Sequence, residues 1–275
     1  MSQRQSMLPG FGLSLGVTVL AISLLVMIPL LALVTRSAEL GLGGIWQTLA
    51  DRRVMAAFRV SFSTAFAAAL LNLFMGLVVA WVLVRYPLPC KRLWDSLIDL
   101  PFALPTAVAG IVLTTLYAPN GWLGRWFAEF GLQVAFTPLG ITIALIFIGL
   151  PFVVRTVEPI LQDLDRQQEE ASTSLGASRW QTFRRVLLPP LVPALLTGFS
   201  LAFARGLGEY GSVIFIAGNM PMKSEIVPLL IVTKLEQYNY PGATVIALAS
   251  LVVAFVMLLV VNGLQQWTRK RTGRE

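Results

Sequence analysis

The chain has 275 residues, of which 56% are hydrophobic and only 13% are charged. Soluble domains carry roughly a quarter charged residues, so this composition excludes an ordinary soluble globular protein. The net charge of +7 does not indicate nucleic-acid binding either, because the basic residues lie in short segments beside apolar runs rather than on one soluble face.

Long uncharged apolar runs predict membrane-spanning helices, since about 20 apolar residues in a helix cross a hydrocarbon core of roughly 30 Å. Every backbone amide in lipid needs a partner, and the runs lack the alternation of a β-barrel, so helices are the required form. We therefore expect an all-α membrane protein with six spans, at 11–35, 57–84, 100–118, 137–158, 189–216 and 241–265.

The first run is longer than the apolar core of a secretory signal and has no clear small-x-small cleavage site, so we expect a retained span. Six spans place both termini on one side, and the segments of that side hold the larger share of Lys and Arg. The positive-inside rule then predicts cytoplasmic termini. The expected organisation is a tail, first span and outer loop over 1–56, a five-helix domain over 57–266, and a basic tail over 267–275.

Prolines and acidic residues mark the inner ends of two spans. Pro101 and Pro105 predict a bend where the third span begins. Asp95, Asp99 and Glu158 flank spans on the inner side, where we expect solvated helix ends rather than a proton relay, because relay acids usually lie deep in a bundle.

The largest inner segment, 159–188, predicts a helix–turn–helix. Good helix formers precede Gly176, which is typical of a helix stop. Ser178 is placed to cap a second short helix, and Pro189 to open the fifth span. Leu164, Ala171 and Leu175 would form one apolar stripe; taken alone, such a segment rests on lipid headgroups more often than it docks on a partner.

The same segment contains Glu170-Ala171-Ser172, then Gly176, and after nine more residues Val186-Leu187-Leu188-Pro189. This spacing resembles the E-A-A, G, I-x-L-P signature of the membrane subunits of ABC importers, with serine replacing the second alanine and valine replacing isoleucine. In that family the loop is a coupling helix that binds a cytoplasmic ATPase. The resemblance assigns ATPase coupling to Glu169, Glu170, Ala171, Ser172, Leu175, Gly176, Leu188 and Pro189.

Four further segments extend the likeness from residue 8 to the C-terminus: 99–110, 151–157, 205–219 and Tyr240-Pro241. Together they resemble the T-type permeases of sulfate and thiosulfate ABC importers. The resemblance implies the type I importer permease fold in a bacterial inner membrane. It also implies a heterodimer with a second permease subunit, two ABC ATPase subunits and a periplasmic sulfate- or thiosulfate-binding protein. A molybdate- or tungstate-type permease is the alternative within this class.

No G-x-x-x-x-G-K-[ST] phosphate loop is present, so we expect a non-catalytic transport subunit without a cofactor, whose partner uses the ATP. One cysteine, Cys90, and no histidine exclude the usual zinc or copper ligands and an internal disulfide. An ion-gradient-driven anion carrier, working without any ATPase, is the alternative from another class.

Arg205 and Glu209 stand well inside the fifth apolar span, where a charge costs about 2.5–3.5 kcal/mol at the bilayer centre. Four residues apart, they lie on one helical face and could pair. The pair could line an anion path or hold the helix to its neighbours, and the need for pairing favours the second role. The G-x-G-x-x-G run at Gly206, Gly208 and Gly211 lacks a preceding strand, which favours close packing or a local bend over a dinucleotide site.

Overall fold

The computed structural model describes the backbone of residues 11–271 and the side chains of residues 11–263. Within that range every regular element is a helix, which confirms the all-α prediction. The predicted tails fall partly outside the described residues, at 1–10 and 272–275. The long helices are α1 (Phe11–Ala38), α3 (Arg52–Arg85), α7 (Pro138–Asp163), α10 (Leu188–Leu207) and α13 (Tyr240–Arg271).

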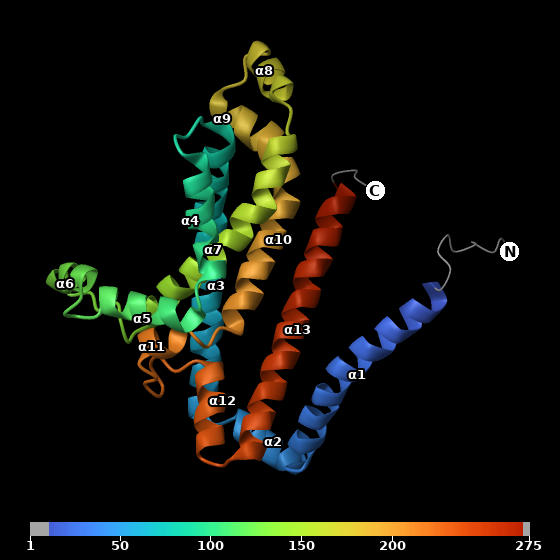
Figure 1. Ribbon diagram of the computed structural model, residues 1–275, viewed down its shortest axis with the longest axis vertical. Helices are drawn as coiled ribbons and strands as arrows, with labels where there is room; N and C mark the ends of the chain where they lie inside the picture. The colour runs from blue at the N-terminus through green and yellow to red at the C-terminus, as the bar shows by residue number, and fades with distance from the viewer. Residues whose placement is uncertain (1–10, 272–275) are drawn as a thin grey trace.

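Short helices connect the long ones. They are α2 (Gly41–Leu49), α4 (Lys91–Ala103), α5 (Thr106–Tyr117), α6 (Trp122–Glu129), α8 (Arg166–Ser174), α9 (Arg179–Thr182), a π-helical turn η1 (Phe183–Leu187), α11 (Val213–Ala217) and α12 (Val227–Glu236). Among them, α8 and α9 lie at one end of the bundle, α2 and α12 at the other, and α5, α6 and α11 at its side (Figure 1).

Five helical stretches of the described chain are long and apolar enough to cross a membrane: α1, α3, α7, the run that contains α10, and α13. The third predicted span falls on a bent pair, because α4 and α5 meet at 106° and pass the same test only together. Pro105 explains the break, since proline pushes the residue before it, Leu104, into an extended conformation. The bend predicted at the prolines is thus confirmed.

The core of the bundle lies between α3, α7 and α10, which bury a common set of aliphatic side chains. Small residues bring these helices close together. A Cβ atom on Gly76 of α3 would lie 2.6 Å from Val153 Cγ1, and one on Gly198 of α10 would lie 2.5 Å from Thr156 Oγ1. Glycines at such contacts let helix backbones approach, as in other membrane bundles.

α1 and α13 lie at the edge of the bundle. They are packed on each other near α2 and diverge toward their other ends (Figure 1). None of the most apolar 18-residue window of α1 is buried, against 61% for α7. The start of α1 and the end of α13 point toward the end of the bundle that carries α8 and α9 (Figure 1). Both described chain ends therefore point toward that helical pair.

Candidate functional site

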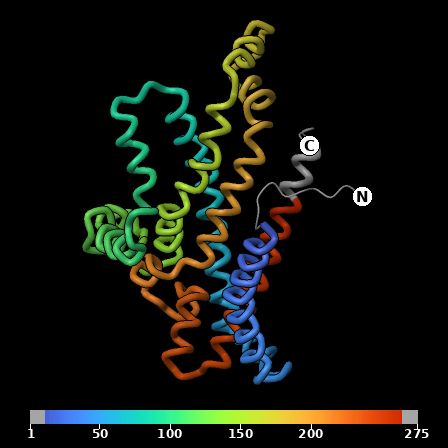
Figure 2. Tube along the Cα trace, turned by 45° about the vertical axis from the view of Figure 1, so that its right-hand side comes forward, coloured from blue at the N-terminus to red at the C-terminus, as the bar shows by residue number. Residues whose placement is uncertain are grey.

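The segment between α7 and α10 projects beyond the bundle as two short helices, which both views show at its tip (Figures 1 and 2). We call residues 166–187 the elbow. Asp165 caps α8 by accepting a 2.9 Å hydrogen bond from the backbone amide two residues on. At the other end Gly176 adopts φ = +83°, and its amide bonds the carbonyl of Thr173 while the amide of Ala177 bonds that of Ser172. This Schellman motif confirms the predicted glycine stop.

The second limb of the elbow also begins as predicted. Ser178 and Gln181 form a reciprocal capping box, with bonds of 2.8 and 3.3 Å between each backbone amide and the other side chain. The helix then widens into η1, where the amide of Leu188 bonds the carbonyl of Phe183, five residues back. The prolines that follow Leu188 lack amide hydrogens and crowd the carbonyls one turn earlier, and the wider turn relieves that crowding.

The two sides of α8 differ in exposure. Glu170, Ala171 and Gly176 are exposed, and Leu175, just beyond the helix, is 88% exposed. The predicted stripe is wrong for Leu164, because α7 continues to Asp163 and Leu164 is an extended linker residue that packs on the main core. The exposed face of the elbow is therefore shorter and more polar than the sequence pattern predicted.

The opposite side of α8 faces the rest of the elbow and the bundle. Ser172 Oγ donates to the carbonyl of Glu169 at 3.0 Å and lies 2.8 Å from Oγ1 of buried Thr182 on α9. An alanine at position 172, as in the signature, would leave the Thr182 hydroxyl without this partner. Ser172, which replaces the alanine of the signature, thus joins the two limbs of the elbow.

A second inward contact ties the elbow to α3. Glu169 Oε1 lies 2.5 Å from Nη2 of Arg85, the last residue of α3. The Arg85 guanidinium lies over the Trp81 ring, 5.6 Å from its centroid, and Trp81 packs edge-on against Phe183 at 6.1 Å. Phe183 in turn stacks on Trp180 at 5.7 Å. Sequence reasoning missed Arg85 and Trp81, because no nearby residue indicates that they contact Glu169 and Phe183, which lie much later in the chain.

The eight predicted coupling residues thus separate into three groups. Glu170, Ala171, Leu175 and Gly176 are exposed, Glu169 and Ser172 point inward, and Leu188 and Pro189 are half-buried in the first turn of α10. The structure brings them to one end of the molecule but not onto one surface.

Arg155 of α7 forms a second charged cluster with α4. It holds Asp99 with two bonds of 2.9 and 2.7 Å, Glu158 with one of 2.6 Å, and the carbonyl of Asp95 at 3.2 Å. The expectation of a solvated end is wrong for Glu158, which is buried beside Arg155 on α7. α4 packs alongside α7 and brings Asp95 and Asp99 to the same guanidinium, where the Asp99 side chain stays 45% exposed. Among the described residues, no group of three or more His, Cys, Asp or Glu side chains is arranged to hold a metal ion.

Arg205 and Glu209 form the expected ion pair, at 2.6 Å. Glu209 is 1% exposed, and its Oε1 also accepts bonds of 3.0 Å from the amide and from the hydroxyl of Ser212. The carboxylate therefore stabilises the turn that follows α10.

The fifth predicted span, 189–216, is too long, because α10 ends at Leu207 and the chain turns at Gly208 before α11. A Cβ atom on Gly211 would lie 2.2 Å from Thr106 Oγ1, so the turn packs tightly on the start of α5. The glycine-rich run thus provides both the bend and the close packing that the sequence predicted.

The end opposite the elbow contains a charged pair that sequence reasoning also missed. Arg53, in the first turn of α3, holds Glu225 through two bonds of 2.7 Å, and Glu225 is 1% exposed. Beside it the amide of Val227 donates to Ser61 Oγ at 2.8 Å. These contacts fasten the start of α12 to α3.

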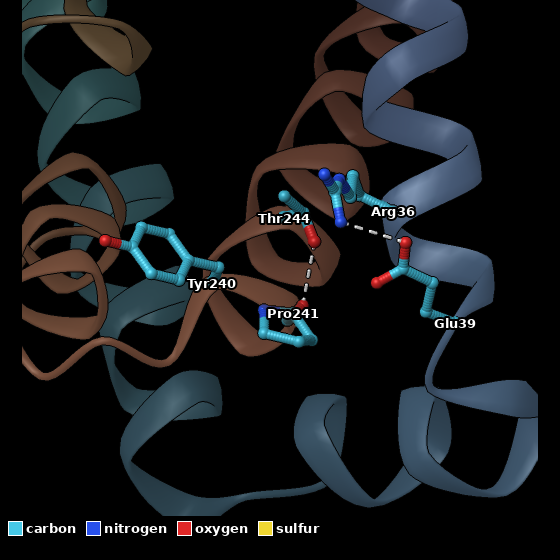
Figure 3. A pocket seen from close by; sticks show the side chains of 5 residues that line it. All are labelled: Arg36, Glu39, Tyr240, Pro241 and Thr244. Carbon is cyan, nitrogen blue, oxygen red and sulfur yellow. Dashed lines mark hydrogen bonds and ion pairs between the residues drawn. The ribbon is translucent and has the colours of Figure 1, made fainter.

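A cavity of about 500 Å³ lies between α1 and α13, near the point where they converge (Figure 3). Its charged lining residues, Arg36 and Glu39, pair with each other at 3.2 Å, and Thr244 bonds the carbonyl of Pro241 at 2.9 Å. None of the predicted site residues lines this cavity.

Comparison with known proteins identifies the family of membrane proteins to which this fold and elbow belong. The family described as binding-protein-dependent transport system inner membrane component matches residues 72–274, and the chain belongs to that family. Its relatives include the sulfate transport system permease protein CysT of Synechocystis sp., 52% identical, with the match covering 92% of this chain and 89% of the relative. The protein of the same name from Escherichia coli is 46% identical over 94% of this chain and 93% of its own length.

Solved structures share the fold. A bacterial ABC transporter involved in the import of the acidic polysaccharide alginate gives a TM-score of 0.76 at 16% identity, covering 94% of this chain and 96% of that one. A bacterial alginate ABC transporter in complex with an alginate pentasaccharide-bound periplasmic protein gives 0.76 at 17% identity, covering 96% of each chain. At such low identity the likeness concerns the fold alone.

Proposed function

We propose that this chain is the membrane permease subunit of an ATP-driven ABC importer that moves sulfate, and thiosulfate as a second substrate, across a bacterial inner membrane. The observation that carries the proposal is the 46–52% identity, over more than nine-tenths of the chain, to proteins named as sulfate transport system permeases. Membership of the binding-protein-dependent family supports an importer supplied by a periplasmic binding protein.

The energy source in this proposal is a separate ATPase that docks on the exposed face of the elbow. The chain has no phosphate-binding loop of its own. Leu175 and Trp180 are large apolar side chains left exposed on a segment that is otherwise polar. A short helix with such anchors fits a groove in a partner. Two ATPase subunits, one for this chain and one for a second permease subunit, complete the proposed complex.

The proposed transport step is a rigid-body switch. ATP-driven closure of the two ATPases moves the two elbows toward each other, and the connected helices then turn an inward-facing cavity outward. The Arg205–Glu209 pair has a structural role here: it fixes the turn after α10, because Glu209 is fully engaged by Arg205 and Ser212.

The proposed orientation places the elbow and both termini in the cytoplasm. The ends of α1 and α13 that point toward the elbow support it, as does the excess of basic residues in the predicted inner segments (Figure 1). Cys90, exposed between α3 and α4, gives a direct test because the chain has one cysteine. A membrane-impermeant maleimide should label it in inverted vesicles and spare it in intact spheroplasts. Labelling in spheroplasts alone would reverse the orientation.

The function is tested by reconstituting the chain with its co-encoded permease, ATPase and binding protein in proteoliposomes. Radiolabelled sulfate should accumulate when ATP is hydrolysed, and accumulation should persist when a protonophore abolishes the proton gradient. Excess thiosulfate should compete, and molybdate or tungstate should not. Competition by molybdate alone would favour the related oxyanion class, and uptake that needs the gradient but no ATPase would contradict the ABC mechanism.

A further inference from the structure

We infer that the Arg85–Glu169 ion pair is a coupling element: it fixes the orientation of α8 relative to α3, so that a displacement of the elbow reaches the bundle. The inference rests on the proposed function, in which an ATPase moves the elbow. Arg85 and Glu169 are positioning residues in this account, because neither touches nucleotide or sulfate.

The connection between α8 and the bundle needs such an element. α8 follows α7 through Leu164 and Asp165, both in extended conformations that interrupt the helix. Its Schellman turn at Gly176 separates it from α9. A force applied to α8 therefore crosses a non-helical joint at each end. The Arg85–Glu169 pair supplies a side-chain contact that bypasses both joints.

The surroundings of Arg85 hold its guanidinium in place. The side chain is only 10% exposed, lies over Trp81, and comes from the last turn of α3, where the helix dipole favours a cation. The Arg36–Glu39 pair also begins in a last helical turn, but its partners are 69% and 54% exposed and lie three residues apart. Exposed pairs of that kind contribute little, whereas removing one partner of a shielded pair has a large effect.

The same turn of α3 contacts both limbs of the elbow. Arg85 reaches Glu169 on α8, while Trp81, four residues earlier and so on the same helical face, packs on Phe183 of η1. Ser172 and Thr182 join the two limbs to each other. These contacts make the elbow and the end of α3 one mechanical unit.

The side of α8 that would dock the ATPase therefore differs from the side that would transmit its movement. Glu170 is exposed, while its neighbour Glu169 is half-buried against Arg85. Successive side chains of a helix point about 100° apart, since there are 3.6 residues per turn. A change at Glu169 should therefore disturb transmission and leave the docking face intact.

The test compares Arg85→Gln, Glu169→Gln and the charge-reversed Arg85→Glu/Glu169→Arg in the complete complex, with Arg36→Gln as the control at an exposed pair. Bound ATPase, ATP hydrolysis and sulfate uptake are measured on equal amounts of assembled complex. Both single variants should retain the ATPase and hydrolyse ATP, while sulfate taken up per ATP falls about tenfold, within the range expected for coupling residues. The reversed pair should recover most of this ratio, and Arg36→Gln should match wild type.

Two results would overturn the inference: single variants that keep the wild-type ratio of sulfate to ATP, or a reversed pair that assembles and stays as uncoupled as the singles. If the single variants assemble poorly, the ratio is measured on the fraction that does assemble, because a merely structural pair would lower the amount of complex and leave the sulfate taken up per ATP unchanged. A wild-type complex that takes up no sulfate would count against the proposed function instead.

Discussion

The two ends of the helix bundle are built differently. At the end opposite the elbow, the first two turns of α3, α12 and α13 enclose a small buried cluster (Val54, Ala57, Val227, Leu230 and Ile246). The Arg53–Glu225 pair, whose carboxylate is buried, lies close to this cluster in the chain. At the elbow end, apolar and charged side chains remain exposed, Leu175 among them. We call the first the closed end because contacts within the chain join its helices there, although Leu42 of α2 is as exposed as Leu175. The elbow projects from the other end and presents a surface that a partner can complete.

Breaking the closed end should have the largest effect. Arg53→Ala leaves the Glu225 carboxylate, 1% exposed, without its cation. Removing one partner of a buried pair typically destabilises a protein by about 3–5 kcal/mol. We expect a lower melting temperature in detergent and less protein in the membrane, measured against Arg36→Ala, whose exposed pair should contribute almost nothing. Equal melting temperatures for the two variants would show that the closed end does not depend on this pair.

Overpacking the middle of the bundle should have the next largest effect. A Cβ at Gly198 would lie 2.5 Å from Thr156 Oγ1 and 2.8 Å from Val153 Cα. Gly198→Ala should therefore destabilise the bundle by about 1–3 kcal/mol. Gly16→Ala in α1 is the matched control, because nothing lies within 4 Å of its Cβ position. Thermal unfolding of both variants checks the difference, and an equally stable Gly198→Ala would contradict the packing described for α10 and α7.

A substitution at the elbow end should have little effect on stability but a large effect on transport. Gly176 has φ = +83° and open space around its Cβ position. Gly176→Leu should cost about 1–2 kcal/mol of local strain, leave membrane insertion intact, and abolish sulfate uptake by tilting or blocking the docking face. Gly43→Ala, with open space and ordinary backbone angles, should transport normally. Normal uptake by Gly176→Leu would refute the coupling role of this turn.

The smallest effect is expected at Ser172. Ser172→Ala restores the alanine of the signature and removes the 2.8 Å contact with Thr182. A lost hydrogen bond of this kind is worth about 0.5–1.5 kcal/mol, so uptake should fall only slightly. Adding Thr182→Val removes the unpaired hydroxyl, and the double variant should transport as well as wild type. A complete loss of uptake in Ser172→Ala would mean that this bond does more than join the two limbs.

The sequence predicted features that depend on nearby residues. The apolar runs, the glycine stop at Gly176, the cap at Ser178 and the bend at the prolines each follow from local chemistry, and the structure has all four. The sequence could not predict contacts that depend on how helices pack. Arg53 and Glu225 lie 172 positions apart, and Arg155 meets Asp99 only because α4 folds back along α7. For the same reason the sequence could not show which side of α8 faces inward, because that also depends on how the helices pack.

The central claim, that the exposed face of the elbow docks a separate ATPase, is tested most directly by site-specific photo-cross-linking in the working complex. A photoreactive residue is placed either at Leu175 or at Leu42 of α2, which is equally exposed at 88% but lies at the opposite end of the bundle. The account predicts an adduct with the ATPase from position 175 and none from position 42. Adducts with lipid alone from position 175, in a complex that still imports sulfate, would contradict it.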